Sequence, residues 1–486
     1  MRATLFNEAE LRALIAPHLG KPYDGEKVRA SIDAMRALYG NEGYVDAQFS
    51  PEFAKDRAAS AVDLVIDVKE NGVVYVGRVR VQKQTYNYEI DLNALESFMD
   101  WTAPGVKDEA IIREVRLQPG AKYRTADEVR SVERLRNLGF LKDATIRREP
   151  TGDPQVSDVV VEVEEDPAAG YLGVSAGVGE RSGPAVTFSY VNPNLFGEAR
   201  VLKAALTLGR RLSSFSIGYL DRQFRDSDDT FEWQAYRDSE SYGEWGQRTY
   251  GASAEYGTPF SEYVRGYMRL RVEQVDLKRR DQDLREDMDS YWVVALRPML
   301  VRDRRDNTRW TTKGYLVSGG IETGYADGAL LKFLHDMEWY KSIDDESDWV
   351  YAYAHRAGVQ PYRASSIGIT ERFYLGGSGS LRGFRYRGVG PKDKGEPDAI
   401  VGGTIMLAQR HELRHRFNKH LRGRAFVDAG IVEDAFYSWG APRVGAGVGV
   451  SVDLGVFVVD VDFGAPVVKQ SNDKTQVVHF RIRSNF

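Results

Sequence analysis

Residues 371–392 read ERFYLGGSGSLRGFRYRGVGPK, with six glycines and four arginines between two strand-like stretches. Glycine permits positive φ and tight folding of the backbone. Each arginine carries a rigid fork of donors that suits a fixed carboxylate partner. A loop in contact only with water has no use for so many fixed guanidinium groups. We therefore predict that this segment folds inward, against other parts of the protein.

The composition permits a membrane β-barrel and excludes a helical membrane protein. Mean hydropathy is -0.44 over 486 residues, and no run approaches the roughly 18 to 20 apolar residues that a spanning helix requires. A spanning strand needs only about ten residues of alternating character, so a barrel is compatible with this hydropathy. The 26 Tyr, 21 Phe and 8 Trp suit the aromatic girdles of such a barrel.

Charge and cysteine content narrow the possible partners. The net charge of -5 argues against a nucleic-acid partner. Cysteine is absent, which excludes a disulfide framework and thiolate metal sites and is compatible with an oxidising compartment. No signal peptide is visible, because the first residues run directly into a charged helical pattern. We predict no metal site and no cofactor.

One pattern occurs twice in the first 165 residues. The stretches 20–23 and 120–123 each lead into a helical pattern that ends at a glycine and is followed by two strand-like runs. The sequence therefore predicts two α+β modules, at 1–70 and 71–166. In the second module the apolar stripe of the helix consists of Val129, Val132, Leu135 and Leu138.

Each module departs from a simple repeat in one respect. The first begins at its first helix, with no strand before it. The second carries an insertion, roughly residues 86–106, that contains Trp101.

From residue 170 to the end the sequence changes to short alternating segments separated by polar clusters, as in strands with one apolar face, and the predicted barrel domain covers 167–486. About 317 residues hold sixteen strands at roughly twenty residues per strand and loop. We predict a transmembrane antiparallel β-barrel after the α+β modules. Its charged interruptions are interpreted as extracellular loops: Arg222–Asp229, Lys278–Asp289 and Ser342–Asp348.

The core of the opening segment is Leu381, Arg382, Gly383 and Phe384. With its flanks it closely resembles, over about twenty residues, the [VL]-R-G-[FY] signature in the sixth loop of the Omp85 family. That loop tucks back into an outer-membrane β-barrel. The repeated modules resemble the POTRA domains that precede Omp85 barrels. The resemblance implies the bacterial outer membrane, with the POTRA domains in the periplasm.

Two further stretches are similar to family motifs. Residues 192–197, NPNLFG, resemble the N-L-F-G turn after the first barrel strand. Residues 303–307, DRRDN, followed by Gly314, resemble the D-x-R-D-N…G segment midway around the barrel.

The motif FVDAG places a carboxylate inside the predicted barrel. In a strand Phe426, Asp428 and Gly430 share one face and the apolar residues between them share the other. Lipid on the apolar side therefore puts Asp428 in the lumen. In the family that the chain resembles, the cation that pairs with this aspartate comes from the inserted loop, and here it would be Arg382. The resemblance also matches a second carboxylate to Glu412. Such a clasp is charge-assisted and bidentate.

The stretch His411–His415 spells H-E-x-x-H, which on a helix would form a zinc site. Its flanks are strand-like, and in a strand the two histidines stand about 13 Å apart. A metalloprotease remains a minor alternative. In the barrel interpretation Glu412 points inward and His411 outward.

The last residues alternate like the final strand of an outer-membrane barrel. Val478, Phe480, Ile482 and the terminal Phe486 are predicted to face lipid. In the first strand three glycines share the lumenal face, Gly173, Gly177 and Gly179, where they contribute no cross-strand side-chain pairs. The final strand offers His479, Arg481 and Arg483 on that face. We predict a weak lateral seam without opposite charges across it.

The closest resemblance is to the BamA branch, which folds and inserts other barrels in the outer membrane. It implies membrane lipid, unfolded outer-membrane clients and periplasmic or lipoprotein accessory subunits as partners. TamA-like translocation and assembly modules, two-partner secretion transporters and a passive porin remain alternatives. No residues resemble a catalytic constellation, so we predict that the protein is not an enzyme.

Overall fold

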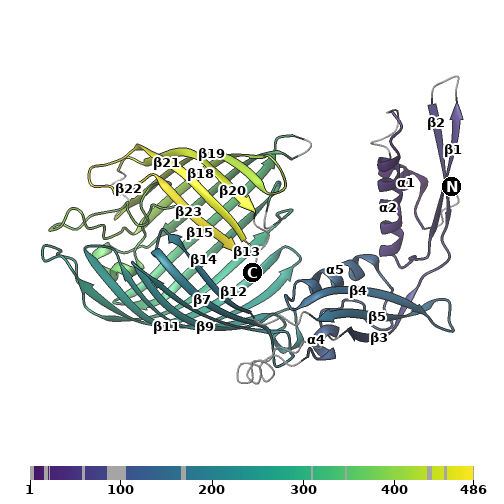
Figure 1. Ribbon diagram of the computed structural model, residues 1–486, viewed down its shortest axis with the longest axis horizontal. Helices are drawn as coiled ribbons and strands as arrows, with labels where there is room; N and C mark the ends of the chain where they lie inside the picture. Colours follow the sequence, from purple (N-terminus) through teal and green to yellow (C-terminus); the bar gives the residue numbers. More distant parts are fainter. Residues whose placement is uncertain are drawn as a thin grey trace. The chain divides into compact units, whose positions relative to one another are not determined.

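The computed structural model describes residues 5–15, 20, 22–56, 61–84, 105–165, 171–307, 310–344, 347–434, 440–453 and 457–484 (Figure 1). The chain divides into two compact units. One comprises 1–171 with 192–201, and the other 172–191 with 202–486. Among these residues no helix has the length and apolar character needed to cross a membrane. Trp101, most of the predicted insertion around it, and Phe486 lie outside the described residues.

The first module packs two helices on a two-stranded antiparallel sheet. Its elements are α1 (Glu8–Ile15), α2 (Gly25–Asn41), β1 (Gln48–Asp56) and β2 (Ala61–Lys69). The Asp24 side chain caps α2 by accepting from the backbone N–H groups of Glu26 and Lys27. Tyr39, on the buried face of α2, is enclosed with Leu11 and Met35. Burial, with the nearby Glu70 carboxylate, raises the pKa of Tyr39 to about 12.

The second module adds three strands and two helices. Its elements are β3 (Tyr75–Gln84), α4 (Asp108–Ile112), α5 (Thr125–Arg136), β4 (Leu141–Pro150) and β5 (Val156–Glu165). The strand order is β3-β5-β4, with β3 parallel to β5, so β3 and β4 are the edges. Gly139 takes φ +81° just after α5, as predicted for a glycine cap.

The predicted apolar stripe of α5 is wrong at one position. Leu135 and Leu138 are buried, but Val129 is 50% exposed. Ser131 lies on the buried face instead, one turn before Leu135. Its hydroxyl donates to the carbonyl of Asp127 and accepts from the N–H of Arg116 at 2.8 Å, so this polar group is satisfied away from water.

Sixteen antiparallel strands form one large sheet, which confirms the predicted number. Each strand neighbours the next along the chain, from β6 at one edge to β23 at the other. The strands are β6 (Tyr171–Gly179), β7 (Gly183–Leu195), β8 (Arg200–Gly209), β9 (Leu212–Asp221), β10 (Thr230–Ser241), β11 (Trp245–Ser261), β12 (Val264–Arg279), β13 (Tyr291–Asp303), β14 (Gly314–Ala326), β15 (Ala329–Ser342), β16 (Trp349–Val359), β18 (Ile405–Arg416), β19 (Leu421–Glu433), β20 (Arg443–Asp453), β21 (Phe457–Val468) and β23 (Val478–Ser484).

Shorter elements occupy the connections. They are the 3-10 turns η2 (Phe224–Asp226), η3 (Ala364–Ser366) and η4 (Ile369–Glu371), and the small ladder between β17 (Gly383–Phe384) and β22 (Thr475–Gln476).

Side chains alternate between the two faces of the sheet, as a barrel wall requires. In β13, Trp292 and Val294 are exposed on the outer face while Val293 and Ala295 are buried.

Strand direction places the predicted extracellular loops on two different rims. Successive strands run in opposite directions, so odd and even connections alternate between rims. Arg222–Asp229 and Ser342–Asp348 lie at the rim where β6 begins, whereas Lys278–Asp289 lies at the opposite rim. The prediction that all three share one side is therefore wrong.

The NPNLFG stretch forms the end of β7 and the turn after it, and β7 is the second strand of the sheet, not the first as predicted. Buried Asn192 and Asn194 build it: Asn192 accepts from the N–H of Asn194, and Asn194 accepts from the N–H of Ala199, both at 3.0 Å. The DRRDN segment joins β13 to β14, midway along the sheet as predicted, and Gly314 closes it at φ +101°.

Candidate functional site: the inserted loop and the seam

The long connection between β16 and β18 folds inward, as predicted for residues 371–392. Leu375, Leu381, Phe384 and Val389 are fully enclosed, and they pack with Met406 and Val432 from the barrel wall. An apolar cluster thus attaches the loop to the inner face of β18 and β19.

Arg382 projects from this loop into a set of carboxylates. Its Nε and Nη2 each donate to one oxygen of Asp428 at 2.8 Å, and its backbone N–H also donates to Asp428 at 3.0 Å. Nη2 lies 2.8 Å from Glu412. Arg382 is 1% exposed and Asp428 0% exposed. The clasp predicted from Arg382, Asp428 and Glu412 is present in the structure.

The clasp has two components that the sequence prediction missed. Asp462 on β21 lies 3.4 Å from Nη1 of Arg382. The guanidinium also stacks 3.5 Å above the ring of Phe426, which confirms that Phe426 and Asp428 share the lumenal face.

Glycines let the loop approach the wall. A Cβ on Gly445 in β20 would overlap the backbone carbonyl of Arg382, and one on Gly430 would lie 2.7 Å from Leu375. Gly383, next to the arginine, takes φ +93°. The positions of Gly445 and Gly383 therefore require glycine for close backbone approach and for positive φ, whereas Gly430 makes room for the Leu375 side chain.

A second ion network attaches the beginning of the loop to the opposite part of the wall. Buried Glu371 accepts from Arg271 of β12 at 3.1 and 3.0 Å and from Lys332 of β15 at 2.5 Å. Arg271 also pairs with Glu322 of β14 at 2.7 Å. The loop is therefore held from two sides of the lumen.

The two edge strands of the sheet meet no ladder partner at their outer edges within the described residues. Gly173, Gly177 and Gly179 lie in β6, and Phe480 and Ile482 lie in β23. Leu172 and Val174 are 69% and 71% exposed, so they mark the lipid-facing side of β6. His479 is enclosed on the lumenal side.

The seam carries a polar link that the prediction left out. Glu180, directly after β6, pairs with Nδ1 of His479 in β23, and its other oxygen accepts from the N–H of Ser378 at 2.7 Å. Nε2 of His479 lies 2.9 Å from the N–H of Gly383. One carboxylate therefore links both edge strands to the inserted loop. The prediction considered only the strand residues and left out the turn.

A family model, described as the Omp85 superfamily domain, matches residues 194–486. The chain belongs to the Omp85 superfamily. The POTRA model, described as a surface antigen variable number repeat, matches residues 3–71 and 103–166. Omp85 proteins of this type are outer-membrane barrels with periplasmic POTRA domains, so the rim where β6 begins is periplasmic and the opposite rim is extracellular.

Two relatives are named outer membrane protein assembly factor BamA. The protein of Neisseria meningitidis is 23% identical over 88% of this chain and 55% of its own length. That of Nitratidesulfovibrio vulgaris is 24% identical over 82% of this chain and 49% of its own. This chain therefore spans about half the length of these relatives.

Solved structures share the fold. The crystal structure of Haemophilus ducreyi BamA lacking POTRA domains 1–3 matches with a TM-score of 0.67 at 17% identity, over 97% of this chain and 96% of that one. CdiB from Acinetobacter baumannii matches with a TM-score of 0.58 at 13% identity, over 99% of this chain and 88% of that one.

The H-E-x-x-H stretch of this Omp85 chain lies in β18 and is not arranged for zinc. Glu412 is engaged by Arg382 and by Arg414 at 2.7 Å. His411 is paired through Nδ1 with the hydroxyl of Tyr351 at 2.7 Å, and His415 stacks on Trp349. The strand geometry separates the two imidazoles, as the sequence analysis expected.

Proposed function

We propose that this chain folds and inserts β-barrel proteins into the outer membrane through the seam between β6 and β23. The observation that supports it is the pair of sheet edges without a ladder between them in the described ranges. Unpaired backbone groups at membrane depth are costly, and a client strand can satisfy them. The glycines of β6 contribute no side-chain pairs that a client strand would have to replace.

The inserted loop weighs against conduction through the lumen. Its apolar cluster and two ion networks occupy the interior. A passive porin has no use for them. A TamA-like module or a two-partner secretion transporter remains the second candidate, because the fold is shared with CdiB. No step of the proposed activity requires a catalytic residue.

The POTRA unit supplies surfaces for partners. Edge strand β3 can add a strand from a client, or from a periplasmic or lipoprotein accessory subunit, by β-augmentation. Backbone hydrogen bonds would provide affinity that tolerates many sequences.

Disulfide closure of the seam tests the proposal. The chain has no cysteine, so pairs placed between residues 172–178 and 478–484 form the only thiols. We expect oxidation to stop assembly of outer-membrane barrels and a reductant to restore it. A matched control pair at Val448 and Phe463 joins β20 and β21, which are already paired, and should leave assembly unchanged.

Full assembly with the seam demonstrably closed would contradict the proposal. Depletion of the protein in its native cell separates the two candidates. Loss of many outer-membrane barrels supports an assembly factor, whereas loss of a single exported protein supports a transporter.

A further inference from the structure

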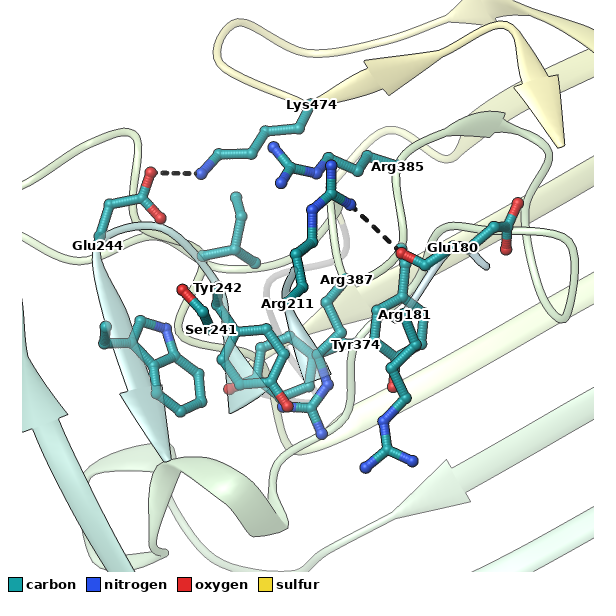
Figure 2. A pocket seen from close by; sticks show the side chains of 13 residues that line it. Glu180, Arg181, Arg211, Ser241, Tyr242, Glu244, Tyr374, Arg385, Arg387 and Lys474 are labelled. Atoms are coloured by element: carbon teal, nitrogen blue, oxygen red, sulfur yellow. Dashed lines mark hydrogen bonds and ion pairs between the residues drawn. The ribbon is translucent and has the colours of Figure 1, made fainter. Parts of the chain in front are cut away.

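The extracellular rim carries a pocket, the outer-rim pocket, beside the end of the seam (Figure 2). Its walls come from the turns after β6, β8 and β10, from the inserted loop, and from the segment that precedes β23. Five cationic side chains and two carboxylates line it: Arg181, Arg211, Arg385, Arg387 and Lys474, with Glu180 and Glu244.

The carboxylates of the outer-rim pocket already have partners. Glu244 binds Lys474 at 2.6 Å. Glu180 binds His479 and the N–H of Ser378. Arg181 is paired outside the lining, with Glu240 and Asp238. None of these acids is left to neutralise the remaining arginines.

Three arginines of the pocket have no carboxylate partner within the described ranges. Arg211 donates only to the backbone carbonyl of Glu180, at 3.3 Å, and the side chain of Arg385 has no hydrogen bond or ion pair there. Arg387 lies against the rings of Tyr242 and Tyr374, 4.8 and 4.4 Å from their centroids, and its buried Nη1 has no hydrogen-bond partner.

Arg211 and Arg385 are close to each other without an anion between them. Figure 2 shows their guanidinium groups next to each other, and the two charges interact. Burial, Arg385 and Arg210 lower the pKa of Arg211. Two like charges in a partly buried site repel each other unless an anion neutralises them.

We propose that the outer-rim pocket binds a terminal phosphate group, with Arg211 and Arg385 as its two ligands. Two guanidinium forks from different segments can share the oxygens and the double negative charge of a phosphate monoester, whereas a carboxylate carries only one negative charge. The space inside is about 30 Å³, room for roughly two water-sized atoms. About two of the phosphate oxygens can therefore enter, and the rest of the ligand stays outside.

A bound phosphate would connect the two sides of the seam. Arg211 contacts the end of β6 through the Glu180 carbonyl. Arg385 is fixed to the segment before β23, because its N–H donates to the Lys474 carbonyl at 2.8 Å. The phosphate group belongs either to free phosphate or to the headgroup of an outer-leaflet lipid.

Arginine modification by phenylglyoxal tests the site in the unaltered full chain. Peptide mass spectrometry follows the reaction of each arginine. We expect inorganic phosphate in detergent, or vesicles of phosphatidylcholine with phosphatidic acid, to protect Arg211 and Arg385. Chloride at equal ionic strength and pure phosphatidylcholine vesicles are the reference conditions. Arg363, exposed on the same loop but outside the pocket, is the internal control and should not be protected.

The comparison of inorganic phosphate with phosphatidic acid vesicles identifies the source of the phosphate group. Protection by inorganic phosphate supports the site with a free anion, and protection by phosphatidic acid alone supports it with a lipid headgroup. Equal reaction rates of Arg211 and Arg385 under all four conditions, or equal protection by chloride, would overturn the proposal.

Variants give a second measurement. Arg211→Gln and Arg385→Gln should each weaken phosphate binding by about tenfold or more in titration calorimetry, because each removes a charged hydrogen-bond donor. Arg363→Gln should bind as the parent does. An unchanged affinity in both pocket variants would also overturn the proposal.

Discussion

Arg382 and Asp428 form a pair in which each charge depends on the other. Asp428 is fully enclosed and accepts three hydrogen bonds from this one residue. Desolvation of both ions is costly, so removing one partner leaves an uncompensated buried charge. The clasp is therefore evidence for a defined loop position more than for extra stability.

We expect Arg382→Ala to lower the free energy of unfolding of the barrel by about 3 to 5 kcal/mol, because the partners are buried. Arg382→Lys should lose less, since it keeps the charge but not the bidentate fork. A double-mutant cycle with Asp428→Asn, followed by denaturant unfolding in detergent, measures the coupling. Additive effects of the two substitutions would show that the two side chains are not coupled energetically.

The exposed pair Arg356 and Asp336 serves as the control. Its ions lie 2.5 Å apart on neighbouring strands, but their side chains are about half exposed. The same cycle there should give a coupling below about 1 kcal/mol.

At this scale the sequence indicated Arg382, Asp428 and Glu412 because each lies in a recognisable local motif. Asp462 and Glu180 could not be found in that way. Asp462 comes close to Arg382 only because β21 pairs with β20, and β20 pairs with β19, the strand that carries Asp428. Glu180 reaches His479 across 299 positions of sequence. Neither contact has a local pattern that would reveal it.

Among the elements, β20 is the strand that sets how close the inserted loop can come. Gly445→Ala should displace the loop, because its Cβ would overlap the Arg382 carbonyl. Backbone cannot move aside as a flexible side chain can, so we expect a loss of about 1 to 3 kcal/mol in unfolding free energy. Gly319→Ala in β14 is the matched control, since nothing lies within 4 Å of its Cβ. Equal effects of the two substitutions would contradict this role of Gly445.

The existence of the elements was easier to predict than their order. The alternation of apolar and polar residues identified strand-like segments. The number of residues after the α+β modules gave the number of strands as sixteen. The NPNLFG turn was assigned to the first strand by its resemblance to a family motif, and the sequence alone did not show that a second strand, β7, comes before it. In α5 only apolar residues were considered for the buried face, so Ser131 was missed and Val129 misplaced.

At the scale of the whole molecule, we expect the barrel unit to fold without the POTRA unit, whereas activity should require both units. Each POTRA module has its own apolar cluster. Deleting residues 1–166 should leave a folded, membrane-inserted barrel and abolish client assembly, because the strand-adding edges are lost. Heat-modifiable gel mobility reports the barrel, and the level of client barrels reports activity.

Residues 167–486 must be present in the membrane in the same amount as the full chain for this comparison. If they then assembled client barrels normally, the POTRA unit would have no role in the mechanism.

The sidedness of the charged loops shows the limit of prediction at this scale. A connection belongs to one rim or the other according to the number of strands before it. A single misplaced strand reverses every later assignment. Charge composition carries no such information, so Arg222–Asp229 and Ser342–Asp348 were placed on the wrong rim.

The carboxylates that hold Arg382 come from β18, β19 and β21, and the histidine beside Gly383 comes from β23. All of these strands follow the inserted loop in the chain. During its own biogenesis the protein can pair Glu371, at the start of the loop, with the earlier strands β12 and β15, but it cannot hold Arg382 until its last strands have joined the wall. A chain that stalls before its C-terminal strands would leave Arg382 without its carboxylates, so a seated Arg382 marks a finished barrel.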